Sequence, residues 1–368
     1  MLPLVVNYTA IGGRSVDAST TSIGSAELES VLPGGDPALH AGKIGVLLIN
    51  LGTPEGTDKA SMRRYLKEFL SDRRVIEWPR AYWYPILYGI VLNVRPKRSG
   101  ALYDKIWNRE ENESPLRTIT RAQGEKLRAS LKAHDAILVD WAMRYGKPSI
   151  AEVAERMIAQ GCDRILLFPL YPQYSAATTA TVNDKFFEIL MSRRFQPAIR
   201  IVPPYYDDLA YIEALAQSIE KHLATLAFRP EVLIASYHGI PKSYSEKGDP
   251  YRDHCLATTT ALRQRLGLGE KQLITTFQSR FGPEEWLKPY TDETVEQLAR
   301  GGTQSIAVFN PGFAADCLET LQEIAMEAAE TFRHAGGDNF SHIPCLNDSE
   351  EGMRMLDTLV RRELSGWI

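Results

Sequence analysis

Short apolar runs alternate with longer amphipathic stretches along most of this sequence, from Lys43 onward. The runs carry few charges, which is typical of strands buried on both faces of a parallel sheet. Seven such strands are expected, at residues 44–49, 136–139, 165–168, 199–202, 232–235, 273–277 and 305–309. The amphipathic stretches predict helices at residues 58–70, 116–133, 150–159, 207–226, 251–266, 293–300 and 316–332. A strand–helix repeat of this kind predicts an α/β protein with parallel sheets.

The length of 368 residues fits two domains better than one. The strands fall into two groups of similar size, and Pro197, which follows a basic pair, marks the break near residues 194–198. Residues 1–42 are rich in Ser, Thr, Gly, Ala and Pro and have no strong apolar period. We expect this segment to be a flexible N-terminal extension, because it has neither the basic start nor the continuous apolar core of a secretory signal.

Composition excludes several classes of protein. With 42 basic and 46 acidic residues the net charge is −4, so the chain lacks the positive charge expected of a nucleic-acid-binding protein. The four cysteines are scattered and contain no C-x-x-C pair, which argues against a disulfide framework and a zinc ribbon. Neither of the glycine-rich signatures of nucleotide binding follows any predicted strand, so a nucleotide-dependent enzyme is disfavoured.

One apolar run, Ala81–Val94, is rich in Trp and Tyr and lies between Arg80 and Arg95. Its 14 residues are too few to span a bilayer as a helix, which needs about 20. Trp and Tyr prefer surfaces where one end of the side chain is apolar and the other is wet. The run therefore predicts an aromatic surface patch on an otherwise ordinary globular protein.

Ligands of open parallel sheets bind beyond the carboxyl ends of the strands. The loops at these ends are crowded with Tyr, Phe, Arg, Gln and Pro, a mixture that suits a large, flat, partly apolar ligand. His238 directly follows an apolar strand, and Gly239 and Pro241 keep it out of a helix. It is a candidate proton acceptor, and a purely structural histidine is the alternative.

A predicted helix that begins at Asp316 carries Glu319, Glu323 and Glu327 at a spacing of four residues, which places them on one face. We expect the first turn to face the ligand cleft, because the helix follows directly from a buried strand. The carboxylates then form a path for protons or a divalent cation. A solvated acidic face is the alternative, and Cys317 is expected to be a small apolar residue.

Several segments together resemble the ferrochelatase family, whose members insert ferrous iron into a porphyrin. The matching segments cover nearly the whole chain from Lys43 onward: LLINLGTPEG, RRYLKEFLSDRRVIE, MRYGKPSI, FPLYPQYSAATTA, SYHGIPKSYSEKGDPY, TTFQSRFGPEEWLKPYTDET and NPGFAADCLETLQEI. The resemblance implies the class II chelatase fold, with two Rossmann-like domains that each have a four-stranded parallel sheet flanked by helices. We expect the first domain at residues 43–195 plus 346–368 and the second at residues 196–345.

The resemblance also implies roles for individual residues. His238 is similar to the family's catalytic histidine and Glu319 to its acidic partner, and both are expected to meet the metal. The proton or metal path continues through Asp316, Glu323 and Glu327. The expected porphyrin contacts are Leu51, Arg95, Tyr103, Ser114, Arg144, Tyr145, Tyr174, Trp286 and Phe313. The expected lip over the cleft, which would shield an apolar substrate and touch a bilayer surface, contains Trp78, Tyr82, Trp83, Ile86 and Leu87.

Two departures from animal relatives are visible. Cys317 occupies the position at which those relatives carry a histidine, which weakens any scheme that needs histidine there. The last residues, RRELSGWI, contain no cysteine, so no iron–sulfur cluster is expected. The resemblance implies no required cofactor, because iron and porphyrin are the substrates.

The resemblance implies the last step of haem synthesis, with protoporphyrin IX as the porphyrin. The alternatives are a coproporphyrin ferrochelatase and a non-catalytic porphyrin or haem carrier. We expect a cytoplasmic protein associated peripherally with the inner membrane through the lip, with Arg80, Arg95, Lys97 and Arg98 meeting anionic head groups or propionates. The oxidase that produces the porphyrin is a further expected partner, and nucleic acid is not.

Overall fold

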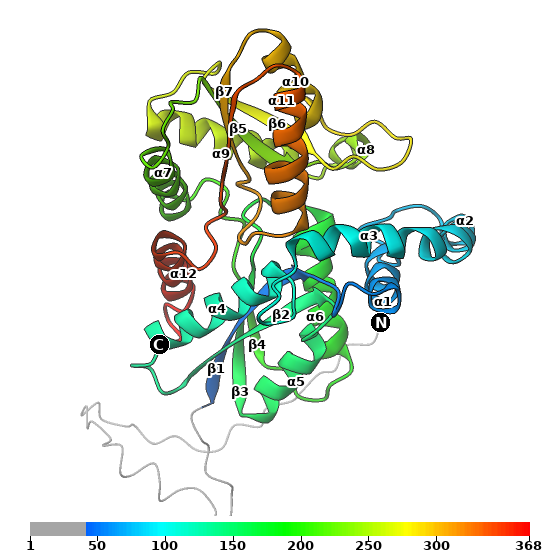
Figure 1. The fold of residues 1–368 in the computed structure, drawn as a ribbon. Helices are drawn as coiled ribbons and strands as arrows, with labels where there is room; N and C mark the ends of the chain where they lie inside the picture. Colours follow the sequence, from blue (N-terminus) through cyan, green and yellow to red (C-terminus); the bar gives the residue numbers. More distant parts are fainter. Residues whose placement is uncertain (1–41) are drawn as a thin grey trace, which may run out of the picture. The chain divides into compact units, whose positions relative to one another are not determined.

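The computed structural model describes residues 42–368, so the predicted extension over residues 1–42 lies, apart from its last residue, outside the described part. Two four-stranded parallel sheets organise this part (Figure 1). The first has the order β2 (Ile137–Tyr145), β1 (Lys43–Gly52), β3 (Cys162–Pro169) and β4 (Ala198–Ile201). The second has the order β6 (Leu273–Gln278), β5 (Val232–His238), β7 (Ser305–Phe309) and β8 (Asn339–Ile343). The predicted fold class is confirmed.

Two details differ from the prediction. β4 pairs with β3, so the strand at residues 198–201 belongs to the first sheet and the predicted division between residues 195 and 196 is wrong. β8 was not expected. It pairs only with β7, and Ile343 is its one buried residue, so an edge strand of this kind lacks the apolar run by which buried strands are recognised.

Helices connect and flank the strands. Side chains cap some of their first turns: Ser149 and Glu152 form a reciprocal capping box at the start of α5. The helices are α1 (Lys59–Leu70), α2 (Arg80–Ile86), η1 (Leu87–Val91), α3 (Leu92–Ile106), α4 (Pro115–Ser130), α5 (Ile150–Ala159), η2 (Ala176–Ala180), α6 (Thr181–Met191), α7 (Leu209–Leu223), α8 (Lys242–Glu246), α9 (Tyr251–Leu266), α10 (Thr291–Arg300), η3 (Glu319–Ala328), α11 (Ala329–His334) and α12 (Glu350–Glu363). The three η segments have the wider turn of a π-helix.

One apolar core joins the two sheets. It contains Leu48 and Phe168 from the first sheet, Tyr237 and Phe309 from the second, and Leu359 from α12. The opposite face of the first sheet packs against α5 and α6, and the opposite face of the second packs against α10, η3 and α11. Because the sheets share a core, residues 42–368 form one compact unit.

A separate apolar cluster lies among α1, α2, η1 and α3 and includes Trp83 and Leu87. Trp83 is only 4% exposed and donates a hydrogen bond from Nε1 to the carbonyl oxygen of Leu70 (2.7 Å). The expectation that Trp83 and Leu87 touch a membrane is therefore wrong, because their side chains hold the segment onto α1. Residues 78–94, called the lip below, do carry exposed apolar side chains: Trp78, Tyr82, Tyr84, Ile86, Tyr88, Ile90 and Val94. Within residues 42–368, no helix is both long and apolar enough to cross a bilayer.

Candidate active site

His238 is the last residue of β5 and lies opposite Gln278, the last residue of β6. Its Nδ1 is 2.6 Å from the carbonyl oxygen of Gly239. A carbonyl oxygen can only accept a hydrogen bond, so Nδ1 is the donor, and in the neutral ring Nε2 then keeps a free lone pair. The half-buried imidazole lies 6.3 Å, centroid to centroid, from the indole ring of Trp286. This tautomer can accept a proton at Nε2.

Glu319 and Glu323 approach the same strand ends from the first turns of η3. The side-chain amide of Gln278 donates to the carbonyl oxygen of Glu319 (2.8 Å) and to Glu323 Oε2 (3.3 Å). The backbone N–H of Ser279 donates to Glu323 Oε1 (2.8 Å), and the Ser279 hydroxyl also donates to this carboxylate. The loop after β6 therefore fixes both η3 and the second of its glutamates.

Burial raises the pKa of Glu323 above its usual carboxyl range. The hydrogen bond from Ser279 and the nearby imidazole of His238 oppose this rise, whereas the charge of Glu319 adds to it. His238, Glu319 and Glu323 thus share one electrostatic environment. A basic imidazole nitrogen and a carboxyl that favours a bound proton are the groups that proton transfer requires.

Tyr103 of α3 and Tyr65 of α1 form the opposite wall. Burial raises the pKa of both phenols well above the usual value, and the charge of Glu319 contributes to the rise in each. Leu318, the residue before Glu319, packs against the apolar cluster that contains both tyrosines. The site therefore lies where the start of η3 meets α1 and α3.

Arg95 of α3 brings a positive charge to the aromatic side of this region. Its guanidinium carbon lies 4.5 Å from the centroid of the Phe281 ring, and Trp286 Nε1 donates to the carbonyl oxygen of Phe281 (2.8 Å). Burial and the neighbouring Arg98 lower the pKa of Arg95, and no carboxylate within residues 42–368 pairs with it. A cation packed against aromatic rings and lacking a carboxylate partner suits an acidic group on an aromatic ligand.

The remaining predicted porphyrin contacts either pack within apolar clusters or form hydrogen bonds within the protein. Leu51 and Phe313 are half-buried and pack against the apolar clusters beside Tyr145 and Cys317. Ser114 is buried and caps α4, with its hydroxyl oxygen accepting from the N–H of Arg117 (3.3 Å). Tyr174 donates its backbone N–H to His254 Nδ1 (3.2 Å). None of these contacts tests a role in porphyrin binding, which stays a prediction.

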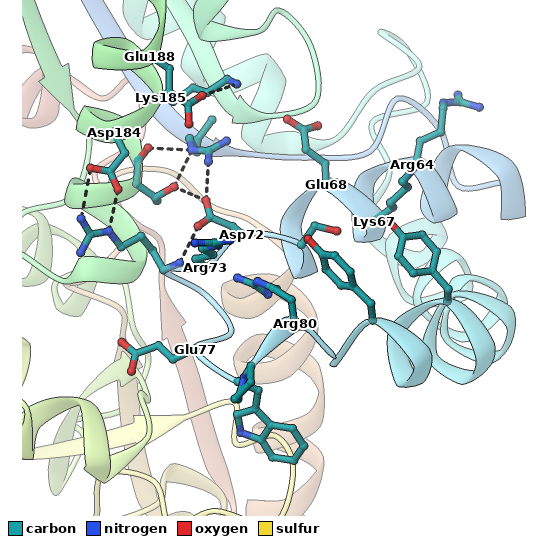
Figure 2. Close-up of a pocket in the computed structure, with 18 residues that line it drawn as sticks. Arg64, Lys67, Glu68, Asp72, Arg73, Glu77, Arg80, Asp184, Lys185 and Glu188 are labelled. Carbon is teal, nitrogen blue, oxygen red and sulfur yellow. Dashed lines mark hydrogen bonds and ion pairs between the residues drawn. The ribbon is translucent and has the colours of Figure 1, made fainter. Parts of the chain in front are cut away.

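Arg144 and Tyr145 use their polar groups within the protein. Both bond to the carboxylate of Asp72, with Tyr145 donating over 2.9 Å, and Arg144 also donates to the Thr181 hydroxyl (2.7 Å). Asp72, Arg144 and Thr181 line a pocket of 1410 Å³ whose lining includes neither His238 nor Glu319 (Figure 2). A polar contact from Arg144 to a ligand would have to replace part of this network.

The residues of the predicted acidic path differ in burial and in hydrogen bonding. The buried carboxylate of Asp316 accepts from Thr320 (2.8 Å) and Asn347 (2.6 Å), so it holds the turn before η3. Glu327 is exposed and lines a second pocket, of 520 Å³, together with Glu323. Burial raises the pKa of the Cys317 thiol well above its usual value, which agrees with its expected role as a small apolar residue.

Sequence reasoning did not assign roles to Tyr65, Gln278 or Ser279. Gln278 and Ser279 stand at the end of the predicted strand over residues 273–277, so the rule that ligands bind at carboxyl ends could have found them. Tyr65 lies in the middle of an amphipathic helix and carries no such signal. Within the described residues, no three His, Cys, Asp or Glu side chains form a ready-made metal cluster.

Comparisons with known proteins agree with this geometry. The ferrochelatase family model matches residues 43–364. A ferrochelatase from Chelativorans sp. is 70% identical over 335 residues, which cover 91% of this chain and 95% of that protein. A ferrochelatase from Brucella anthropi is 71% identical over 326 residues, which cover 89% of this chain and 93% of that protein.

Among solved structures, SirB from Bacillus subtilis with Fe3+ superposes with a TM-score of 0.53 at 11% identity, covering 88% of this chain and 97% of SirB. This likeness supports the fold alone. The family-model match and the high identity over nearly full length carry the assignment: the chain belongs to the ferrochelatase family of metal chelatases.

Proposed function

We propose that the protein inserts ferrous iron into protoporphyrin IX to form protohaem, the last step of haem synthesis. The single observation that carries the chemistry is the contact of His238 Nδ1 with the carbonyl oxygen of Gly239, because in the neutral ring it leaves Nε2 free to accept a proton. Family membership supplies the substrate class, iron and a porphyrin, and no further cofactor is required.

A free-base porphyrin holds two N–H groups in the space that the metal must occupy. The ring has to bend so that its nitrogen lone pairs point out of plane, and binding energy from the ring's periphery can support that distortion. Two protons must then leave. An imidazole whose ordinary pKa is about 6.5 is well matched to accept them at neutral pH.

Glu319 and Glu323 have complementary roles in this scheme. They carry the released protons away from His238 or deliver the cation, and the raised pKa of Glu323 favours a carboxyl that binds and releases protons. Arg95 holds a propionate, because its guanidinium has no carboxylate partner within residues 42–368. Trp286 and Phe313 pack against the ring.

The lip contacts a membrane surface from which an apolar porphyrin arrives. Tyr82, Ile90 and Val94 support this role, because they expose large apolar side chains on one short segment of the chain. The protein is then peripherally associated with the inner membrane, where it can receive porphyrin from the preceding oxidase.

Replacing His238 with Ala tests the reaction. Zinc insertion, followed by porphyrin fluorescence, should fall by about 10²–10⁴-fold, the usual contribution of a general base. The porphyrin affinity of His238→Ala should remain close to that of the wild type. Zinc insertion by Glu319→Gln should also be severely slowed. His134→Ala, in the turn between α4 and β2, is the matched control. Near wild-type turnover of His238→Ala would remove this residue from the reaction.

The same assay separates the proposed substrate from its alternatives. We expect faster turnover of protoporphyrin than of coproporphyrin, because the exposed lip favours an apolar porphyrin. Faster turnover of coproporphyrin would mean that the protein is a coproporphyrin ferrochelatase instead. Tight porphyrin binding with no chelation of either porphyrin would instead indicate a carrier.

A further inference from the structure

The pocket of 1410 Å³ lies outside the candidate active site and is formed by α1, the lip and α6 (Figure 2). None of the proposed proton-transferring residues lines it. Its lining is strongly charged and includes three aromatic residues of the lip, Trp78, Tyr84 and Tyr88. Arg144, one of the predicted porphyrin contacts, lines this pocket, but its guanidinium is bonded to Asp72 and Thr181, and the proposed reaction gives the pocket no role.

Most charges in the pocket neutralise one another. Arg74 pairs with Asp184 (2.8 Å), and Lys185 pairs with Glu188 (3.0 Å). The remaining acidic groups are also engaged: Asp72 pairs with Arg144, Glu77 with Lys247, and Glu68 accepts from the N–H of Gly146. Three cations, Lys67, Arg73 and Arg80, have no carboxylate partner within residues 42–368. The pocket therefore has an excess of positive charge.

Arg80 is the most unusual of the three. Both terminal nitrogens of its guanidinium are buried, and neither has a hydrogen-bond partner in the described part of the chain. Figure 2 shows this side chain directed inward among the residues that line the pocket. Burying a cationic group without a partner costs free energy. An anion with several acceptor oxygens, bound in this pocket, offsets that cost.

Aromatic and apolar residues adjoin this charge. The Arg80 guanidinium lies 5.7 Å from the Tyr84 ring centroid, and Lys67 Nζ lies 5.8 Å from that of Tyr88. On the same short segment, Tyr82 is 72% exposed and Ile90 is 59% exposed. Positive charge beside exposed aromatic and apolar side chains is the pattern of a surface that binds anionic lipid.

We propose that this pocket binds the phosphate head group of an anionic phospholipid while the exposed side chains of the lip enter the membrane interface. A phosphodiester offers the acceptor oxygens that Arg73 and Arg80 lack, and arginine is well suited to phosphate geometry. The inference rests on the proposed membrane contact of the lip and adds the chemical identity of the lipid. The head group holds the lip at the surface from which the porphyrin is delivered.

Co-sedimentation of the full-length chain with vesicles tests the proposal. Vesicles of phosphatidylcholine, with and without phosphatidylglycerol, are compared for the wild type, Arg73→Gln and Arg80→Gln. Each variant should bind phosphatidylglycerol vesicles about fivefold more weakly than the wild type, the change given by losing about 1 kcal/mol for one basic residue near a membrane. Binding to pure phosphatidylcholine should change much less, because the choline cation offsets the charge of that lipid's phosphate.

Arg64→Gln is the matched control, because it removes the same charge from the rim of the pocket but from a residue already paired with Glu55 (3.3 Å). An equal loss in Arg64→Gln and Arg80→Gln would mean diffuse attraction of charge and would overturn the proposed site. Wild-type affinity of Arg80→Gln for phosphatidylglycerol vesicles would overturn it as well.

Two further arms separate this proposal from the membrane contact itself. Tyr82→Ser with Ile90→Ser should weaken binding to both kinds of vesicle, because these residues act through apolar contact. If the wild type binds neither vesicle, the membrane contact and the head-group site both fail. If inorganic phosphate stabilises the wild type but not Arg80→Gln while vesicles do not bind, the pocket holds a soluble phosphate and the lipid assignment is wrong.

Discussion

The side-chain amide of Gln278 can take only one orientation in its surroundings. Its Oε1 accepts from the hydroxyl of Ser236 and from the side-chain amide of Asn310, both over 2.7 Å. Its Nε2 therefore faces η3 and donates to the carbonyl oxygen of Glu319 and to the carboxylate of Glu323. Gln278 touches no reacting atom in the proposed scheme. It is a positioning residue that connects three strands of the second sheet to the acidic helix.

Replacing Gln278 with Glu keeps the shape of the side chain but removes the donor and adds a negative charge. The turnover number should fall by about 10–100-fold, as when an outer-shell partner of a metal site is removed. KM for porphyrin should change little. The acid limb of the pH–rate profile should move to higher pH, because another carboxylate beside Glu319 raises the pKa of Glu323 further.

Gln264→Glu on the exposed surface of α9 introduces the same charge away from the site and serves as the control. A Gln278→Glu enzyme with reduced turnover but an unshifted pH profile would mean that the residue only supports the fold. Unchanged turnover would mean that η3 needs no such support.

At the scale of elements, the lip shows how one short segment can serve two environments. α2 and η1 turn Trp83 and Leu87 toward α1, and they leave Tyr82, Ile86 and Ile90 on the outside. The indole N–H of Trp83 is bonded to the last residue of α1, so the ring is fixed as well as buried. The exposed residues can therefore be changed without dismantling the segment, and the buried ones cannot.

Trp83→Ala should destabilise the protein by about 3–5 kcal/mol, the usual cost of deleting a buried aromatic side chain. Tyr82→Ala should change the free energy of unfolding by less than about 0.5 kcal/mol, since this ring is largely exposed. Urea denaturation of the two variants checks both values. A similarly small loss of unfolding free energy in both variants would mean that Trp83 lies on the surface.

For the whole molecule, the shared core is the decisive feature. Leu359 of α12 lies fully buried in the core that joins both sheets, and α12 packs against α7 and α4. The buried side-chain amide of Gln123 on α4 also donates to the carbonyl oxygens of Ala314 (3.1 Å) and Asn347 (2.8 Å). The two sheets are thus joined by apolar packing and by directed hydrogen bonds.

We expect the two sheets to unfold in a single transition. Leu359→Ala should lower the free energy of that transition by about 2–5 kcal/mol without splitting it. Calorimetry and circular dichroism should report the same midpoint for the wild type and for the variant. Two separated transitions in the wild type would show that the shared core does not couple the sheets.

Much of the fold and the centre of the site follow from sequence pattern. Buried parallel strands produce continuous apolar runs, so seven of the eight strands were predicted, and His238 was singled out because it ends one of them. β8 was missed because this edge strand has only one fully buried residue, Ile343, and its sequence, NFSHI, has no continuous apolar run.

By itself, the sequence determined the α/β class, the alternation of strands and helices, and the position of His238 and the glutamates at one end of a sheet. These depend on local periodicity and on the rule that loops at the carboxyl ends of parallel strands meet. Only the tertiary structure decided that Trp83 faces inward, that Arg144 bonds to Asp72 and that Arg80 has no partner in the described chain. The physical reason is that burial and charge pairing are set by contacts between residues far apart in the sequence, which no local pattern records.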